Sequence, residues 1–178
     1  MNFMEIIQRN EETIKKVKDM SIFRFIPQEE FKNCQNYINI IRFKKGEDII
    51  RQGEITGGIF ILLAGKVSVI RDSVKLSELE KGEIFGEGEI LLGRPASATI
   101  KAEEDGTEVA YIIRGALEAL EKSAPRFTTI FYKTIARILM ERLINLDREY
   151  VNIASKLKNT EEAQKIKELR EKIFKTPK

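Results

Sequence analysis

Two glycines and two glutamates alternate in the segment Gly86-Glu87-Gly88-Glu89, between a β-rich run and a predicted short helix. Glycine has no side chain, so the backbone at Gly86 and Gly88 can approach a bound molecule closely. The free amides that open a helix over residues 87–91 would face an anion. The segment therefore predicts a binding loop for a small anion. It is not the dinucleotide fingerprint G-x-G-x-x-G, because Leu91 stands where the third glycine is required.

Catalytic chemistry has no support in the composition. The 178 residues include no histidine and a single cysteine, Cys34. The lack of histidine removes imidazole general bases, Cys-His nucleophilic pairs and His-containing metal sites. One cysteine cannot form an intrachain disulfide, and we interpret Cys34 as a small buried hydrophobic side chain. We expect a protein that is not an enzyme, with no catalytic residue, no metal site and no cofactor.

The charge and hydropathy patterns limit the partners and the compartment. A formal net charge of +3 produces no strong field for nucleic acid. Charged residues such as Glu5 and Arg9 interrupt the N-terminal segment, which lacks a signal-peptide pattern. No apolar stretch reaches membrane-spanning length. These patterns predict a cytoplasmic protein that does not enter a membrane.

Short β-rich segments separated by glycine turns occupy the middle of the chain, between Tyr37 and Ile113. A tight reversal is expected at Asp72-Ser73, and the segment at 59–63 is apolar throughout, as in a strand buried on both faces. Strands of this length and spacing are typical of a closed or sandwiched all-β unit. The predicted strands are 38–43, 48–51, 59–63, 67–71, 74–79, 98–102 and 108–113.

Helical patterns flank this β region. On the N-terminal side, Phe3–Met20 reads as one amphipathic helix, Ser21 can cap a short second helix, and Pro27 fits the first turn of a third. On the C-terminal side, 116–122 forms a short helix and Pro125 opens a long one.

Apolar residues in the long helix follow a 4-3-4-3-4 spacing, which is the seam of a coiled coil. Tyr132 and Ala136 extend the pattern backward, while Phe131, Ile135 and Ile138 lie on a neighbouring face that can pack on the β unit. The alternative is one broad face packed within the same chain, but beyond Asp147 no second core remains to cover it. We therefore expect a parallel homodimer. Its interface residues are Leu139, Leu143, Leu146, Tyr150, Ile153 and Leu157.

Three ordered blocks resemble the cyclic-nucleotide-binding domain family, of the catabolite activator and protein kinase A regulatory subunit type. They are FKKGEDIIRQGE at 43–54, FILLAGKV at 60–67 and FGEGEILLGRPASAT at 85–99. The resemblance implies a mainly β fold with helices: an eight-stranded β-roll, jelly-roll-like, flanked by N-terminal helices and a long C-terminal helix. It also implies that the third block is a phosphate-binding cassette and that the ligand is cAMP or cGMP.

The cassette departs from the family pattern where charge matters most. By resemblance, Glu87 corresponds to the glutamate that binds the ribose 2′-hydroxyl. The arginine that binds the cyclic phosphate corresponds to Ala96 in the kinase-type spacing and to Ser97 in the activator-type spacing, and Arg94 is out of register. Glu89 replaces a small residue, and its carboxylate would face either the phosphate or water. A charged hydrogen bond contributes about 1.5–3 kcal/mol, so we expect cAMP to bind weakly.

These patterns predict a regulatory module that senses a cyclic nucleotide or related small anion and transmits the signal through its C-terminal helices. The alternative is a degenerate β-roll that no longer binds nucleotide and acts as a dimeric scaffold for an unknown protein partner. The expected ligand-binding residues are Gly86, Glu87, Gly88, Glu89, Ile90, Arg94, Ala96, Ser97 and Ala98.

The expected organisation is N-terminal helices over 1–36, the β-roll over 37–115, a hinge helix and the dimerisation helix over 116–158, and a charged helix over 159–178. After the long helix only one helical pattern remains. That is too short for the three-helix unit that reads a major groove, so we expect no direct DNA binding.

Overall fold

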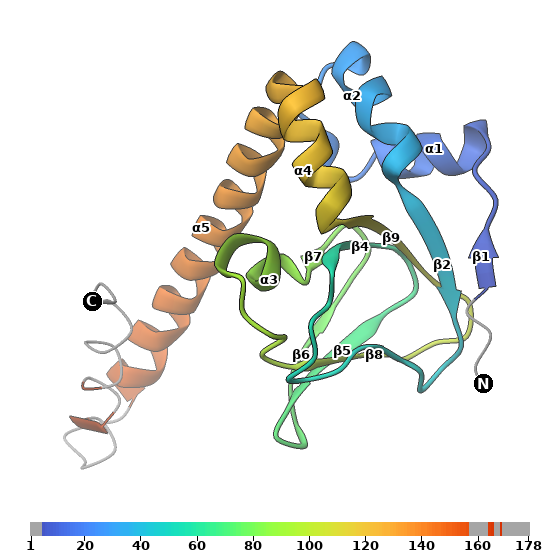
Figure 1. Cartoon of the computed structure of the whole chain (residues 1–178). Coiled ribbons are helices and arrows are strands. Elements are labelled where there is room, and N and C mark those ends of the chain that lie inside the picture. The colour runs from blue at the N-terminus through green and yellow to red at the C-terminus, as the bar shows by residue number, and fades with distance from the viewer. Residues whose placement is uncertain (1–4, 157–163, 166–167, 169–178) are drawn as a thin grey trace. The chain divides into compact units, whose positions relative to one another are not determined.

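The computed structural model describes residues 5–156, 164, 165 and 168 (Figure 1). The chain consists of two compact units, Met1–Ile135 and Ala136–Lys178. The first unit holds the strands and most helices. The long helix α5 (Pro125–Lys156) begins in the first unit and continues into the second.

Two antiparallel sheets form the β-roll of the first unit, and their strands are seen in Figure 1. The predicted mainly β architecture with flanking helices is confirmed, and β2 to β9 supply eight strands. One sheet has the order β1 (Glu5–Ile7), β2 (Asn39–Phe43), β9 (Thr107–Ile113), β4 (Gly58–Ala64) and β7 (Ile84–Phe85). The other has the order β3 (Asp48–Ile50), β8 (Thr99–Ala102), β5 (Val67–Arg71) and β6 (Val74–Leu79).

The turn between β5 and β6 shows how local sequence sets the register. Asp72 and Ser73 both have positive φ, 50° and 66°, as a two-residue hairpin turn requires. Arg71 is therefore paired with Val74, and a register shift between Val69 and Ile70 then brings Val67 opposite Leu79. The tight reversal predicted at these residues is confirmed.

The interior of the roll is apolar. Its core includes Leu62, Val67, Phe85 and Val109, with Ile49, Phe60, Val69, Leu79, Ala96 and Tyr111 packed against it while partly exposed. Strand β4, which lies between β9 and β7, is buried along most of both faces, as its continuous apolar run predicts.

A second apolar cluster joins the N-terminal helices to the first turns of α5. Phe23 stacks edge-on against Phe31 at 5.2 Å between ring centroids and lies 6.0 Å from Phe131. Phe127 and Ile135 are also fully buried. Phe131, Ile135 and Ile138 were expected to pack on the β unit. Phe131 and Ile135 are buried and Ile138 is half-buried, and the rings that Phe131 contacts include Phe23 and Phe127 of the helices.

The N-terminal segment differs from its prediction as one helix over Phe3–Met20. Residues Glu5–Ile7 form β1, which pairs antiparallel with β2, and helix α1 is limited to Glu11–Lys18. Asn10 ends the extended stretch because its side chain accepts a hydrogen bond from the Thr13 amide and caps α1. The helical prediction was wrong for residues 5–10 and for residues 19 and 20.

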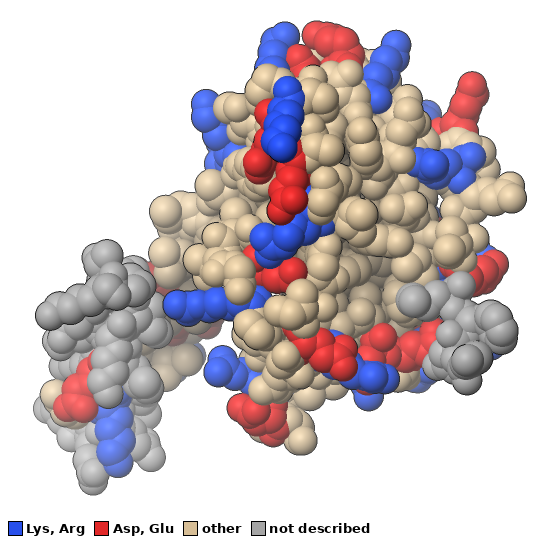
Figure 2. All heavy atoms as spheres, in the orientation of Figure 1, with Lys and Arg blue, Asp and Glu red and all other residues tan. Residues whose placement is uncertain are grey.

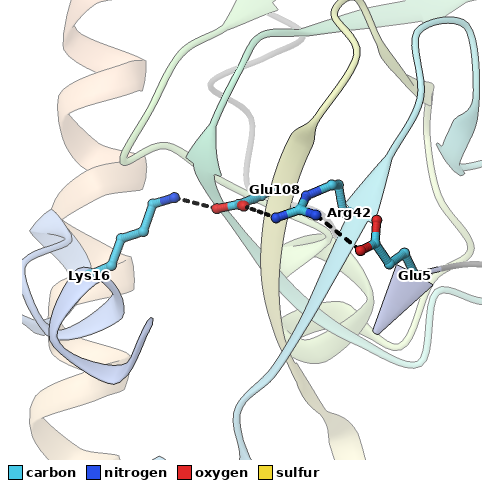
Figure 3. Close-up of polar contacts among 4 residues, drawn as sticks. All are labelled: Glu5, Lys16, Arg42 and Glu108. Atoms are coloured by element: carbon cyan, nitrogen blue, oxygen red, sulfur yellow. Dashed lines mark hydrogen bonds and ion pairs between the residues drawn. The ribbon is translucent and has the colours of Figure 1, made fainter. Parts of the chain in front are cut away.

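Four charged residues fasten this segment to the roll (Figure 3). The Glu108 carboxylate on β9 accepts hydrogen bonds from Lys16 of α1 and from Arg42 of β2, and the Arg42–Glu108 distance is 3.0 Å. Arg42 also pairs with Glu5 of β1 at 3.0 Å. Burial alone would raise the pKa of Glu108, but the hydrogen bonds from Lys16 and Arg42 hold it below its ordinary value.

The remaining helices are short. The 3-10 helix η1 (Ser21–Phe23) has no side-chain cap. The Ser21 hydroxyl instead donates to the Gly82 carbonyl at 3.0 Å, so the predicted capping role of Ser21 was wrong.

Helix α2 (Gln28–Cys34) follows Pro27, and the 3-10 helix η2 (Gln35–Tyr37) leads into β2. Cys34 is fully buried, as predicted.

Candidate functional site

The glycine-glutamate segment lies where strand β7 leads into helix α3 (Glu87–Leu92). Gly86 joins the two with a left-handed backbone, φ +79°. A Cβ atom there would lie 2.8 Å from Phe60 Cδ2 and 2.9 Å from the Gly58 carbonyl oxygen. Glycine is therefore required at 86 both by the backbone and by close packing on β4.

Gly88, by contrast, is not required by the chain itself. It is exposed, it has ordinary helical backbone, and a Cβ atom there would meet no atom within 4 Å. The neighbouring Glu87 is half-buried at the start of α3. The sequence interpretation grouped the two glycines as equivalent, and the structure separates their roles.

The far end of the loop returns to the turn between β3 and β4. The Ala96 amide donates to the Glu54 carbonyl at 2.9 Å, and the Gly53 amide donates to the Ala96 carbonyl at 2.8 Å. The Ala96 side chain packs against the apolar core of the roll. The backbone at residue 96 is thus held by reciprocal hydrogen bonds with its side chain directed inward.

The other predicted ligand residues differ in exposure. Arg94 and Ser97 are exposed, whereas Ile90 and Ala98 are half-buried. Sequence spacing offered Ala96 and Ser97 as the position that corresponds to the family's arginine. Of these two residues, Ala96 is the one that packs against the core of the roll. Arg94 is the sole cation of the described segment 85–99.

Glu89 is placed by contacts that its local sequence does not predict. Only 4% of the residue is exposed. Its Oε2 accepts hydrogen bonds from the Thr56 hydroxyl at 2.5 Å and the Gly57 amide at 2.7 Å, and its Oε1 lies 3.4 Å from Nη2 of Arg114. The carboxylate therefore does not point to water, which was one of the two orientations considered.

These contacts keep Glu89 ionised. Burial alone would raise the pKa of its carboxyl, but hydrogen bonds from Thr56, Gly57 and Arg114 outweigh that effect and lower the pKa below its ordinary value. Thr56, Gly57 and Arg114 were missed by the sequence interpretation. Arg114 is 25 residues from Glu89, so no local spacing connects them.

Aromatic rings of the roll lie beside the loop. Phe60 stacks on Phe85 at 5.4 Å and on Tyr111 at 5.8 Å between centroids. Phe60 and Tyr111 are half-buried, and both come from strands of the sheet that ends in β7. Of the two rings, Phe60 lies next to Gly86 and offers a flat apolar surface there.

The predicted dimer seam lies on α5. Leu146 and Ile153 are 56% and 48% exposed, while Leu139, Leu143 and Tyr150 are half-buried. Met140, Ile144 and Val151 are exposed as well, so the apolar surface is wider than the seam. Leu157 and the interruption expected at Asn159 lie outside the described residues.

The backward extension of the seam has an intrachain partner. The Tyr132 hydroxyl donates to Glu121 of helix α4 (Arg114–Ser123) at 2.8 Å. Burial and this carboxylate raise the pKa of Tyr132 to about 12. Tyr132 thus helps to hold α4 against the first turns of α5.

Charges are mixed over the surface. On the face seen in Figure 2, blue and red side chains are interspersed, with no broad area of one sign among the coloured residues. Within the described part of the chain, no three metal-ligating side chains gather into a cluster. None of the helices found there is both long and apolar enough to cross a bilayer.

The sequence is similar to known nucleotide-regulated proteins. Residues 40–123 match the family described as "Cyclic nucleotide-binding domain". A cGMP-dependent protein kinase of Plasmodium berghei is 30% identical over 154 residues, which are 86% of this chain and 16% of the kinase. The chain thus spans less than a fifth of that relative.

Solved structures share the fold. A cyclic nucleotide-binding domain from Methylobacillus flagellatus superposes with a TM-score of 0.73 at 20% identity, covering 89% of this chain and 92% of the other. The catabolite activator protein of Thermus thermophilus gives 0.63 at 27% identity, covering 76% and 63%.

Proposed function

We propose that this chain, whose residues 40–123 match the cyclic nucleotide-binding domain family, is a non-catalytic, cytoplasmic regulatory module. Its β-roll senses a cyclic nucleotide or a related small anion at the loop between β7 and β8. Binding is transmitted through α4 and α5, and the module works as a homodimer.

The preserved geometry of the loop carries this proposal. Gly86 adopts the left-handed turn that starts α3, and Ala96 is held at the other end by Gly53 and Glu54. Glu87 and Gly88 lie between these two fixed points, with the Phe60 ring packed beside Gly86. An ordered loop of this kind supports retention of the binding site.

The side chain at residue 96 determines the expected affinity. Ala96 offers no positive charge, and a phosphate bound beside α3 would lack the bidentate partner that an arginine provides. Losing one such charge-assisted bond removes about 1.5–3 kcal/mol, which is roughly tenfold to a hundredfold in affinity. We therefore expect weak binding of cAMP and cGMP.

Calorimetric titration with cAMP and cGMP tests the proposal. The variant Ala96→Arg should bind one of them at least tenfold more tightly than the unmodified protein. Leu92→Arg is the matched control, because it adds the same charge at an exposed position of α3 that is not among the expected ligand-binding residues. Glu89 should be left unchanged in both variants, since its carboxylate is engaged by Thr56, Gly57 and Arg114.

The two variants separate the competing explanations. Equal gains in Ala96→Arg and Leu92→Arg would mean that added charge attracts the nucleotide without a defined site. No gain in either variant, with no binding to the unmodified protein, would favour the scaffold function and overturn the proposal.

A further inference from the structure

Three segments of the first unit meet at the Glu89 side chain. They are the start of β4 with the residues before it, the cassette helix α3, and the first residue of α4. Figure 1 shows α3 close to the end of α4 that follows β9. Burial of a carboxylate costs free energy unless its oxygens accept hydrogen bonds. Glu89 is only 4% exposed, and its oxygens are contacted by Thr56, Gly57 and Arg114.

Arg114 contacts Glu89 twice. Its Nη2 donates to the Glu89 carbonyl oxygen at 2.6 Å and lies 3.4 Å from the carboxylate Oε1. The same carbonyl accepts the Gly93 amide at 2.8 Å, at the end of α3. A guanidinium at the carboxyl end of a helix also meets the negative end of the helix dipole.

The backbone of Arg114 completes the junction. Its amide donates to the Gly57 carbonyl at 2.8 Å, while the Gly57 amide donates to Glu89 Oε2 at 2.7 Å. Gly57 is thus bonded to both partners of the Glu89–Arg114 pair. Motion of α3 away from β4 would break contacts to Thr56, Gly57 and Arg114 together.

We infer that Glu89 and Arg114 form an internal lock that holds the cassette helix α3 against the start of α4. A ligand can displace α3 only if it binds the displaced state more tightly, by more than the lock stabilises the present one. The lock therefore sets how readily a signal at the loop reaches α4.

Hydrogen exchange followed by mass spectrometry of the full chain tests the lock. Glu89→Gln keeps the shape but removes the charge, so α3 and the first turn of α4 should exchange about 10- to 100-fold faster, as expected for the loss of one charged hydrogen bond. Strands β2 and β9 should keep their exchange rates. Glu78→Gln is the matched control, because Glu78 is a half-exposed carboxylate paired with Lys66 and Lys75 on the other sheet.

A second variant keeps the test decisive if Glu89→Gln fails to fold. Arg114→Lys retains the positive charge but loses the planar fork, so it should also release α3 and α4. Arg51→Lys is its control, at an exposed arginine that pairs with Asp48. Glu89→Gln weakens the bonds from Thr56 and Gly57, whereas Arg114→Lys weakens the bond to the Glu89 carbonyl. The double variant Glu89→Gln/Arg114→Lys should therefore exceed either single change but fall short of their sum, since the two changes share the carboxylate–guanidinium contact.

Two results would overturn the inference. One is unchanged exchange at α3 and α4 in Glu89→Gln and in Arg114→Lys. The other is an equal increase throughout the first unit, which would show that the pair contributes only to global stability. The experiment uses no ligand, so its failure leaves the proposed nucleotide site standing.

Discussion

At the scale of single residues, identical residue types have different physical roles in the loop. Gly86 and Gly88 are two positions apart, and only Gly86 has a positive φ and a crowded Cβ direction. Glu87 and Glu89 are also two apart, and only Glu89 is buried. The role of each residue in the loop therefore depends on its tertiary contacts and not on its residue type alone.

The two glycines give a matched pair of alanine variants. Gly86→Ala places a Cβ atom against Phe60 and the Gly58 carbonyl in a strained backbone, and we expect a loss of about 1–3 kcal/mol in unfolding free energy. Gly88→Ala meets open space in a helix and should be neutral or slightly stabilising, by up to about 1 kcal/mol. Urea denaturation measures both, and equal effects would contradict the assignment.

Glu108 gives a prediction about pH. Its folded pKa is depressed below the ordinary value of 4.5, so its stabilising contribution is present above that pH and is lost as pH falls through the lower folded pKa. Glu108→Gln should lower the unfolding free energy by about 1 kcal/mol at neutral pH and flatten the acid side of the stability profile. Chemical denaturation between neutral pH and pH 3 would show it, and an unchanged acid slope would argue against the network in Figure 3.

At the scale of elements, the sequence correctly predicted the helices and strands whose bounds depend on neighbouring residues. Strands β5 and β6 were predicted with their observed bounds, because Asp72-Ser73 fixes the turn and the apolar residues fix the strands. Pro125 correctly marks the start of α5. These features depend on neighbours in sequence alone.

Elements that depend on distant partners were not predicted. Strand β1 exists because Glu5–Ile7 can pair with β2, more than 30 residues away, and an isolated stretch with that composition also reads as helix. Strand β7 has two residues, too few for any periodicity. In the candidate site, glycine chemistry predicted close approach to the backbone at Gly86, where the structure places Phe60 and the Gly58 carbonyl. The Arg114 contact depends on the tertiary fold and was not predicted.

The apolar surface of α5 supports a prediction about assembly. Leu146→Glu/Ile153→Glu places charges at two exposed seam positions and should convert a dimer into a monomer, as measured by light scattering at micromolar concentration. Asn145→Glu/Asn152→Glu is the matched control, since these residues precede the seam positions and lie on the outer side of the heptad. If the unmodified protein is already a monomer, the seam is not an interface.

At the scale of the whole molecule, α5 belongs to both units. Its first turns are buried with Phe127, Phe131 and Ile135 in the first unit, and from Ala136 onward it belongs to the second. A helix is stiff because every turn is hydrogen-bonded to the next. One continuous helix therefore contributes residues to both units.

The burial of Cys34 has a practical consequence for measuring these motions. It is the sole thiol of the chain, and burial raises its pKa to about 12, so reactive thiolate is scarce at neutral pH. An alkylating reagent can modify the native chain only after the packing around α2 has opened. The rate of Cys34 alkylation therefore reports how often the helical core opens, and no engineered label is required.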